Sequence, residues 1–175
     1  MINSVEISNY DPNWPKEFEE EKQRLLSLIG SHVIGIEHVG STAVPGLGAK
    51  PIIDILIGLK DLNDAKSCIP LLERLNYEYV PEYEDELPER RYFRKPPRGQ
   101  GRRKFHIHMV ATSSDFWERQ LLFRDYLRLH PEVAKEYYIL KKELVAKFTN
   151  NRRMYTDNKT VFITKVLEKA REELE

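Results

Sequence analysis

Residues 36–57 read IEHVGSTAVPGLGAKPIIDILI, and the fold prediction starts from them. The β-branched segment from Val33 to Val39 and the aliphatic run from Pro51 to Leu59 are typical of central strands whose sheet is covered on both faces. The residues between the two segments include three of the eight glycines of the chain, and Pro45-Gly46 is a turn dipeptide. The sequence therefore predicts a strand, a glycine-rich loop and a buried strand, in that order.

The segments before and after this unit predict helices and further strands. Asn13 to Gly30 carries apolar residues at helical spacing, with Pro15 near its start. Residues 62–75 also keep helical spacing, so Pro70 must either lie in the first turn of that helix or kink it. Three more strands are expected at residues 77–80, 90–95 and 104–111, the last two joined by a hairpin that contains PPRGQG.

The carboxyl-terminal part of the chain is predicted to be helical. Ser114 caps the first of three expected helices, Pro131 suits the first turn of the second, and Thr156 caps the third. The element order predicts an α+β protein: a mixed β-sheet with flanking helices and a helical carboxyl-terminal half. We expect one domain over residues 1–175, with no internal repeat and no evident linker.

Composition excludes several classes of protein. Hydrophobic residues make up 41% and charged residues 32% of the chain, which is typical of a globular protein and not of a disordered one. Twenty-eight basic residues offset twenty-eight acidic ones, so no overall charge indicates a nucleic-acid or membrane partner. Cys68 is the single cysteine, which excludes an intramolecular disulfide, and we expect it to be buried.

The amino-terminal sequence MINSVEISNY lacks the basic and apolar regions of a secretion signal. The apolar runs are far shorter than the roughly 20 residues that cross a bilayer. We therefore expect a cytoplasmic protein with no membrane partner. The oligomeric state is left open.

The glycine-rich loop is a candidate phosphate site. Small residues let backbone N–H groups approach an anion, and the hydroxyls of Ser41 and Thr42 add donors. Gly40 begins the loop, and Lys50 ends it with a cationic side chain. The loop matches neither the P-loop nor the dinucleotide-binding motif. The alternative is a glycine-rich turn that only crosses over the sheet.

Asp54, His106 and His108 are polar residues on apolar strands, and we expect them to converge on one site. A carboxylate in a buried strand costs several kcal/mol unless a cation, a metal ion or hydrogen-bond donors offset it. His106 and His108 lie two residues apart, so a strand presents both imidazoles on the same face, as pairs of metal ligands often are. The alternatives are a structural ion pair for Asp54 and a solvated sheet face for the two histidines. At most one of Glu37 and His38 is expected to join this site.

Charge is arranged in two blocks of opposite sign. Residues 82–89 contain five acidic residues, and residues 90–104 contain eight basic and no acidic ones. Arg91 and Arg94 are therefore candidate phosphate contacts, and the basic hairpin is a candidate RNA-binding element. The alternative is a solvated hairpin that the neighbouring acidic loop neutralises.

The 36–57 segment resembles the hallmark of the GrpB-like family of bacterial proteins. Further segments resemble that family in the expected order: YDPNWP at 10–15, RYFRK at 91–95, FHIHM at 105–109, LFRDYL at 122–127 and YTDNK at 155–159. The resemblance covers nearly the whole chain. It implies a nucleotidyltransferase-type fold, and the family also occurs joined to dephospho-CoA kinase in some bacteria.

In the wider nucleotidyltransferase superfamily, a Gly-Ser pair follows the first strand, two carboxylates sit two residues apart on the next strand, and a later strand adds a third acid. Gly40, Ser41 and Asp54 match that pattern, but Ile52 or Leu56 stands where the second carboxylate would be. The strand of His106 and His108 would take the place of the third acid. Because imidazoles stand in for carboxylates, these departures from the superfamily pattern point to one divalent transition metal ion (zinc, manganese or nickel) on Asp54, His106 and His108, with magnesium less favoured. The alternative is a metal-free pocket that binds nucleotides without turning them over.

These residues predict a protein that binds a nucleotide or another phosphorylated small molecule. If it is an enzyme, phosphoryl or nucleotidyl transfer is the expected reaction, with Asp54 and the two histidines as the catalytic and metal-binding residues and Lys50 or Arg91 offsetting charge. The alternative is a binding module without catalysis, which uses the basic hairpin on RNA or on a protein partner.

Overall fold

The computed structural model describes residues 6–174, and a five-stranded mixed sheet lies at its centre. Across the sheet the strands are β1 (Gly35–Val39), β2 (Ile53–Leu59), β5 (Phe105–Ala111), β4 (Arg90–Lys95) and β3 (Glu78–Tyr79). β2 and β5 are parallel, and the other neighbouring pairs are antiparallel. The five strands of the described residues therefore form a single mixed sheet, as the sequence predicts.

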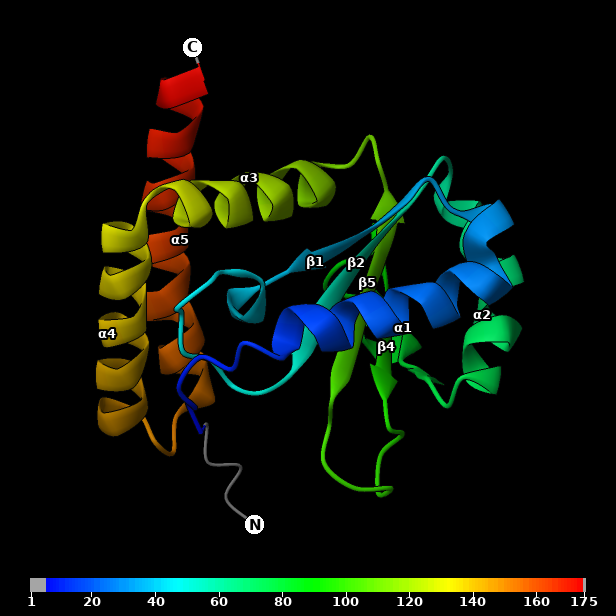
Figure 1. Ribbon diagram of the computed structural model, residues 1–175, viewed down its shortest axis with the longest axis horizontal. Coiled ribbons are helices and arrows are strands. Elements are labelled where there is room, and N and C mark those ends of the chain that lie inside the picture. Colours follow the sequence, from blue (N-terminus) through cyan, green and yellow to red (C-terminus); the bar gives the residue numbers. More distant parts are fainter. Residues whose placement is uncertain (1–5, 175) are drawn as a thin grey trace.

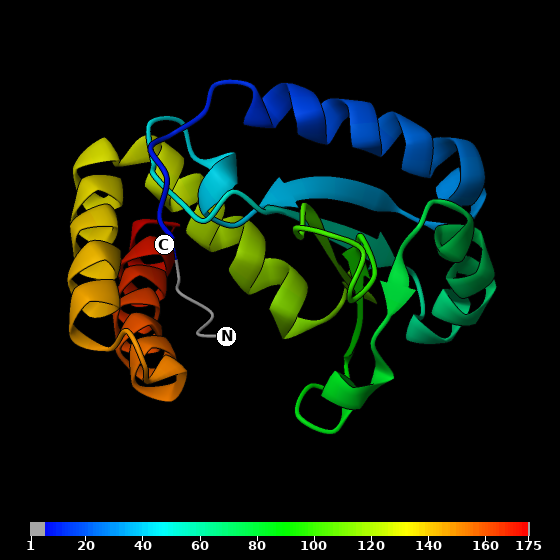
Figure 2. The ribbon, with the colours of Figure 1, turned by 90° about the horizontal axis from the view of Figure 1, so that it is seen from below.

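Helices cover both faces of this sheet (Figures 1 and 2). They are α1 (Trp14–Ile29), α2 (Ala65–Arg74), α3 (Asp115–Leu129), α4 (Pro131–Lys147) and α5 (Arg152–Leu174). Seen from below, α1 lies above the sheet and α3 beneath it, while α4 and α5 stand side by side at one end (Figure 2). The α+β prediction, with flanking helices and a helical carboxyl-terminal half, is confirmed.

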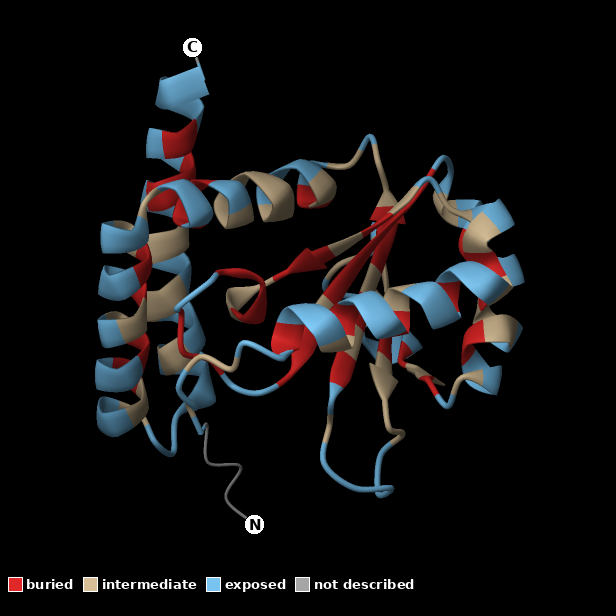
Figure 3. Ribbon diagram, in the orientation of Figure 1, coloured by how far each residue is buried: buried red, intermediate tan, exposed pale blue. Residues whose placement is uncertain are grey.

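The two faces of the sheet have different chemistry because alternate residues of a strand point to opposite sides. On the side of α1 and α2, aliphatic residues such as Ile55 and Ile107 pack with Leu25 and Ile29 in the main core. Figure 3 shows this buried layer along β1, β2 and β5. The opposite face carries Asp54, and the hydrophobic contacts of α3 cover only part of it.

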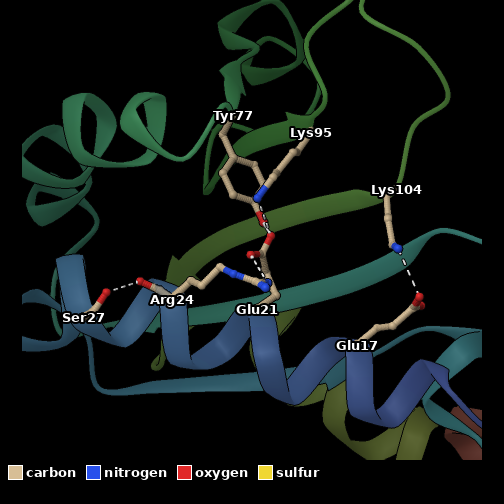
Figure 4. A network of polar contacts seen from close by, with 7 residues as sticks. All are labelled: Glu17, Glu21, Arg24, Ser27, Tyr77, Lys95 and Lys104. Atoms are coloured by element: carbon tan, nitrogen blue, oxygen red, sulfur yellow. Dashed lines mark hydrogen bonds and ion pairs between the residues drawn. The ribbon is translucent and has the colours of Figure 1, made fainter.

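A buried carboxylate ties α1 to the sheet. Glu21 is fully buried and accepts hydrogen bonds from the Tyr77 hydroxyl and the Lys95 ammonium, each at 2.9 Å (Figure 4). The nearby pair of Lys104 and Glu17, 3.0 Å apart, is much more exposed. Glu21 therefore holds three separate segments of the chain together in the interior.

The structure agrees with most of the predicted element positions and corrects one. The strand bounds differ from those predicted by two residues or fewer, Ser114 caps α3, and Pro131 begins α4. Thr156 is not a helix cap, because α5 begins one turn earlier and the Thr156 hydroxyl donates to the Arg152 carbonyl inside it. The Asn151 side chain accepts the Met154 N–H instead, and so caps the helix. Pro70 lies inside α2, beyond its first turn.

Two further expectations concern burial and the membrane. Cys68 is fully buried, as predicted. Across residues 6–174, no helix combines the length and the apolar character needed to cross a bilayer.

Candidate functional site

A cavity of about 520 Å³ lies between the polar face of the sheet, the glycine-rich loop and the carboxyl-terminal helices. β2 contributes Asp54 and β5 contributes His106 and His108, while Ser41 and Lys50 come from the loop. Residues of α3, α4 and α5 form the opposite wall. The cavity therefore joins segments that are more than a hundred residues apart in sequence.

Asp54 and the two histidines converge, as the alternation of the strands predicts. Register places His106 beside Asp54 on the neighbouring parallel strand. Nε2 of His108 lies 3.0 Å from Oδ1 of Asp54, and Nδ1 of His106 lies 3.6 Å from the same oxygen. The three side chains form one polar cluster on the floor of the cavity.

Arg90 settles which nitrogen of His108 carries the proton. The Arg90 guanidinium, which can only donate, lies 3.3 Å from Nδ1 of His108. Nδ1 is therefore the acceptor, and Nε2–H donates to Asp54. Burial lowers the pKa of His108 below its usual value, although Asp54 opposes this, so the neutral ring is favoured.

Asp54 is held as a carboxylate. Burial alone would raise its pKa, but the hydrogen bonds from His106 and His108 more than offset this and hold the pKa well below its usual range. This agrees with the expectation that a carboxylate on an apolar strand needs partners.

Gly40 lets the loop pass directly over this carboxylate. Its φ is +76°, in the region that side chains other than glycine rarely adopt, and an added Cβ would lie 2.7 Å from Oδ2 of Asp54. The short 3₁₀ helix at Ser41–Ala43 follows immediately. Glycine is therefore needed here both for backbone conformation and for space.

Lys141 of α4 reaches the loop from the helical half of the molecule. It is only 4% exposed, and its ammonium lies 2.9 Å from Oγ of Ser41 and 3.0 Å from the Gly48 carbonyl. Burial and the nearby charge of Lys159 lower its pKa from 10.5 to about 7. A buried amine with two acceptors therefore joins the loop to the helices.

The wall opposite the sheet is strongly basic. Together the helices add Arg119, Lys141, Arg152 and Lys159 to Lys50 of the loop, so five basic side chains line the cavity. Asp54 is the one acidic residue among the described residues of the lining. Such an arrangement favours an anionic ligand.

Sequence reasoning missed the four cations on the helices. The lining positions of α5 recur at 152, 155, 156, 159, 160, 163, 164 and 167, which is one face of a helix. The YTDNK segment at 155–159 was recognised as a family landmark, but nothing local indicated that it faces the loop. Lys141 lacked even this signal, because its spacing places it on the buried stripe of α4.

The same segments match a known family. A family model described as "GrpB protein" matches residues 4–169 of the chain. The chain belongs to the GrpB family. The family resemblance inferred from its motifs is therefore confirmed.

Relatives and a solved structure agree with this assignment. The chain is 41% identical over 167 residues to UPF0157 protein YqkA of Bacillus subtilis, covering 95% of this chain but 47% of that protein's length. It is 36% identical to the "Glutamate-rich protein GrpB" of Alkalihalophilus pseudofirmus, covering 93% and 94% of the two chains. The crystal structure of the conserved protein GrpB from Enterococcus faecalis superimposes with a TM-score of 0.84 at 36% identity and covers 97% of this chain and all of that one.

Among the residues predicted to bind the ligand, Thr42 lines the cavity in this GrpB fold. The Thr42 hydroxyl is buried and lies 2.8 Å from Nε2 of His38, which stacks on Phe18. Neither Arg91 nor Arg94 is in the lining of the cavity. Arg94 makes a bidentate pair with Glu78 at 2.9 and 3.1 Å, while Arg91 points to the opposite side of β4.

The basic hairpin is partly neutralised. Among its cations, Arg91 and Arg94 pair with Glu84 and Glu78, and Lys95 and Lys104 pair with two carboxylates of α1. The acidic loop at 81–84 supplies Glu84. Only Glu84 of these four carboxylates belongs to the acidic block at 82–89. Glu78 lies in β3 and the other two in α1, so the hairpin is offset mainly from outside that block.

The geometry also bears on which residues could hold a metal ion. Within residues 6–174, no three or more His, Cys, Asp or Glu side chains are grouped as metal ligands. Both nitrogens of His108 already have partners, Arg90 and Asp54. Of the predicted set, His108 is therefore the side chain least free to bind an ion.

Proposed function

We propose that this GrpB protein binds a nucleotide or another phosphorylated small molecule in the cavity above Asp54. The observation that carries the proposal is the set of five basic side chains around a cavity whose described lining has one carboxylate. A volume of about 520 Å³ lies within the range of ligand pockets, roughly 300–1,000 Å³. A polyphosphate has the charge to match this lining.

The contacts suggest how the ligand would be held. Lys50 and Ser41 would meet phosphate oxygens at the loop, and Arg152 and Lys159 would meet them from α5. A match to a protein named dephospho-CoA kinase, of Mycolicibacterium paratuberculosis, supports a ligand of the nucleotide class. It is 28% identical over 153 residues, which cover 75% of this chain and 37% of that protein.

The proposal extends to phosphoryl or nucleotidyl transfer on a nucleotidyltransferase-type fold. Cations around the cavity would offset the charge that develops on the transferred group. One divalent transition ion (zinc, manganese or nickel) would be held by Asp54 and His106 and completed by oxygens of the ligand. The role of His108 in this proposal is to orient Asp54, since it donates to that carboxylate.

Thermal unfolding of the purified protein with nucleoside triphosphates tests the binding step. A ligand at 100 times its dissociation constant stabilises the folded state by about 2.7 kcal/mol, so a bound triphosphate raises Tm. Lys50→Ala and Lys159→Ala should each weaken binding by about 1–3 kcal/mol through loss of a charge-assisted hydrogen bond. Lys66→Ala, an exposed position on α2 outside the cavity lining, is the matched control and should not change it.

Repeating the titration with chelator and with each divalent ion tests the metal. We expect zinc, manganese or nickel to bind more tightly than magnesium by calorimetry, and His106→Ala to remove most of that difference. Equal, weak binding of all four ions would contradict the metal proposal. A Tm unchanged by every triphosphate, with or without metal, would contradict the nucleotide form of the ligand proposal.

A further inference from the structure

Ser41 and Lys141 form a hydroxyl–amine pair that phosphate binding alone does not require. Lys141 Nζ lies 2.9 Å from Ser41 Oγ, and the lysine is almost fully buried behind the loop. Ser41 itself is only partly buried and lines the cavity. A hydroxyl open to the cavity thus has an amine directly behind it, within hydrogen-bond distance.

We propose that Ser41 is a nucleophile and Lys141 its general base, acting on the phosphoric anhydride of a ligand in the cavity. This inference rests on the proposed function for its natural substrate. Ser41 Oγ forms a bond to the terminal phosphorus, and the bridging P–O bond breaks. The leaving phosphate takes the electron pair of that bond, and the hydroxyl proton passes to Nζ of Lys141. The products are a phosphoserine at position 41 and the shortened nucleotide.

The two contacts of Lys141 suit a neutral amine as well as an ammonium. A neutral amine has two N–H donors and one lone pair, so it can donate to the Gly48 carbonyl and accept the Ser41 proton. The pKa of about 7 leaves much of Lys141 neutral at physiological pH. Serine hydroxyls are weak nucleophiles unless such a base is beside them.

The surroundings of Lys141 favour the neutral form. Burial and the like charge of Lys159 on α5 both oppose the ammonium. The ring of Tyr137, 4.8 Å from Nζ on the same helix, acts the other way, because an aromatic ring attracts a cation. Tyr155 of α5 and Arg119 of α3 line the same cavity. Asp54, the carboxylate of β2, raises the pKa of Lys159. The pKa of Lys141 responds to burial and to Lys159 instead. Asp54 is the one acidic residue in the described lining, so no second carboxylate there stabilises the ammonium of Lys141.

A neutral organophosphorus probe tests whether Ser41 and Lys141 react as a nucleophile and its base. Because the probe carries no charge, its reaction does not require the site to bind an anion. Diisopropyl fluorophosphate reacts when Ser41 Oγ bonds to phosphorus, the P–F bond breaks, fluoride leaves and the proton passes to Lys141. We expect peptide mapping of the native protein to find the adduct on Ser41 and none on Ser31, an exposed serine outside the cavity lining. Mapping the native protein requires no variant that could fail to fold.

The base is tested by pH and by substitution. The labelling rate should rise as pH increases through about 7 and then level off, because it follows the neutral fraction of Lys141. Lys141→Arg keeps a cation behind the loop but is not a base, and should slow labelling about 100-fold or more. The variant's Tm reports whether it folds.

The outcomes separate this inference from the proposed function. Absence of the adduct on Ser41, or a rate that Lys141→Arg and pH leave unchanged, overturns the inference, even when triphosphates bind. An adduct with the expected pH profile supports it, even when no triphosphate raises Tm. Transfer of one phosphoryl group from a triphosphate to Ser41, mapped in the same way, would support both.

Discussion

At the scale of single residues, Lys141 makes stability depend on pH. Its pKa falls from 10.5 to about 7 on folding, so between these values the unfolded chain binds more protons than the folded one. The free energy of unfolding therefore rises with pH in this window, by about 3 kcal/mol from pH 7 to pH 9.5. We expect this rise in the native protein and its loss in Lys141→Met.

Urea unfolding at a series of pH values measures this effect. Lys142→Met removes an exposed lysine one residue further along α4 and should keep the native pH dependence. If the free energy of unfolding changed with pH in the same way for the native protein and Lys141→Met, Lys141 would be charged in the folded state throughout this pH range.

Gly40 is a second single residue on which the stability of the fold depends. Gly40→Ala combines a positive φ with an added Cβ 2.7 Å from Oδ2 of Asp54, whereas Gly46→Ala has a similar φ of +80° and nothing within 4 Å. We expect both to be destabilising, by about 1–3 kcal/mol from backbone strain, and Gly40→Ala to cost more. Chemical unfolding measures both, and equal losses would mean that the carboxylate moves aside freely.

At the scale of elements, Glu21 decides how firmly α1 is attached. Glu21→Ala leaves Lys95 and Tyr77 without their buried partner, which costs about 3–5 kcal/mol. Glu17→Ala breaks the exposed pair with Lys104, on the same helix, and should cost less than about 1 kcal/mol. Urea unfolding compares them, and similar losses would contradict the structural role of Glu21.

At the scale of the whole molecule, the cavity joins the sheet to the helical half. Hydrogen exchange with a bound triphosphate should slow in residues 40–50 and in the first turns of α5, because both would contact the ligand. The hairpin tip at 96–101 should exchange unchanged, since it is not in the lining. Protection confined to the hairpin would favour the RNA-binding alternative.

The cavity and the basic hairpin differ in how their charges are balanced. The chain carries equal numbers of acidic and basic residues, yet its cavity is basic because four cations on three helices are gathered around one loop. The basic hairpin, with eight basic residues at 90–104, is partly offset by carboxylates of β3 and α1. Overall composition therefore predicts neither surface.

The strands, the glycine-rich loop and the convergence of Asp54 with the histidines could all be predicted from the amino-acid sequence. Aliphatic runs, glycines and the two-residue repeat of strands are local signals, and the pairing of β2 with β5 brings their polar positions to one face. The sequence did not reveal the start of α5, because Asn151 and Thr156 are both plausible caps and packing selects between them.

The side chains that face Asp54 across the cavity could not be predicted, because they are brought there by tertiary packing. Lys141 reads as one polar residue on an apolar helix stripe, and Lys159 as one of many surface lysines. Their meeting with Ser41 depends on how α4 and α5 pack against the loop, which is set by contacts between residues about 100 positions apart. No local pattern records such a distance, so the basic wall of the cavity follows from the packing of the helices.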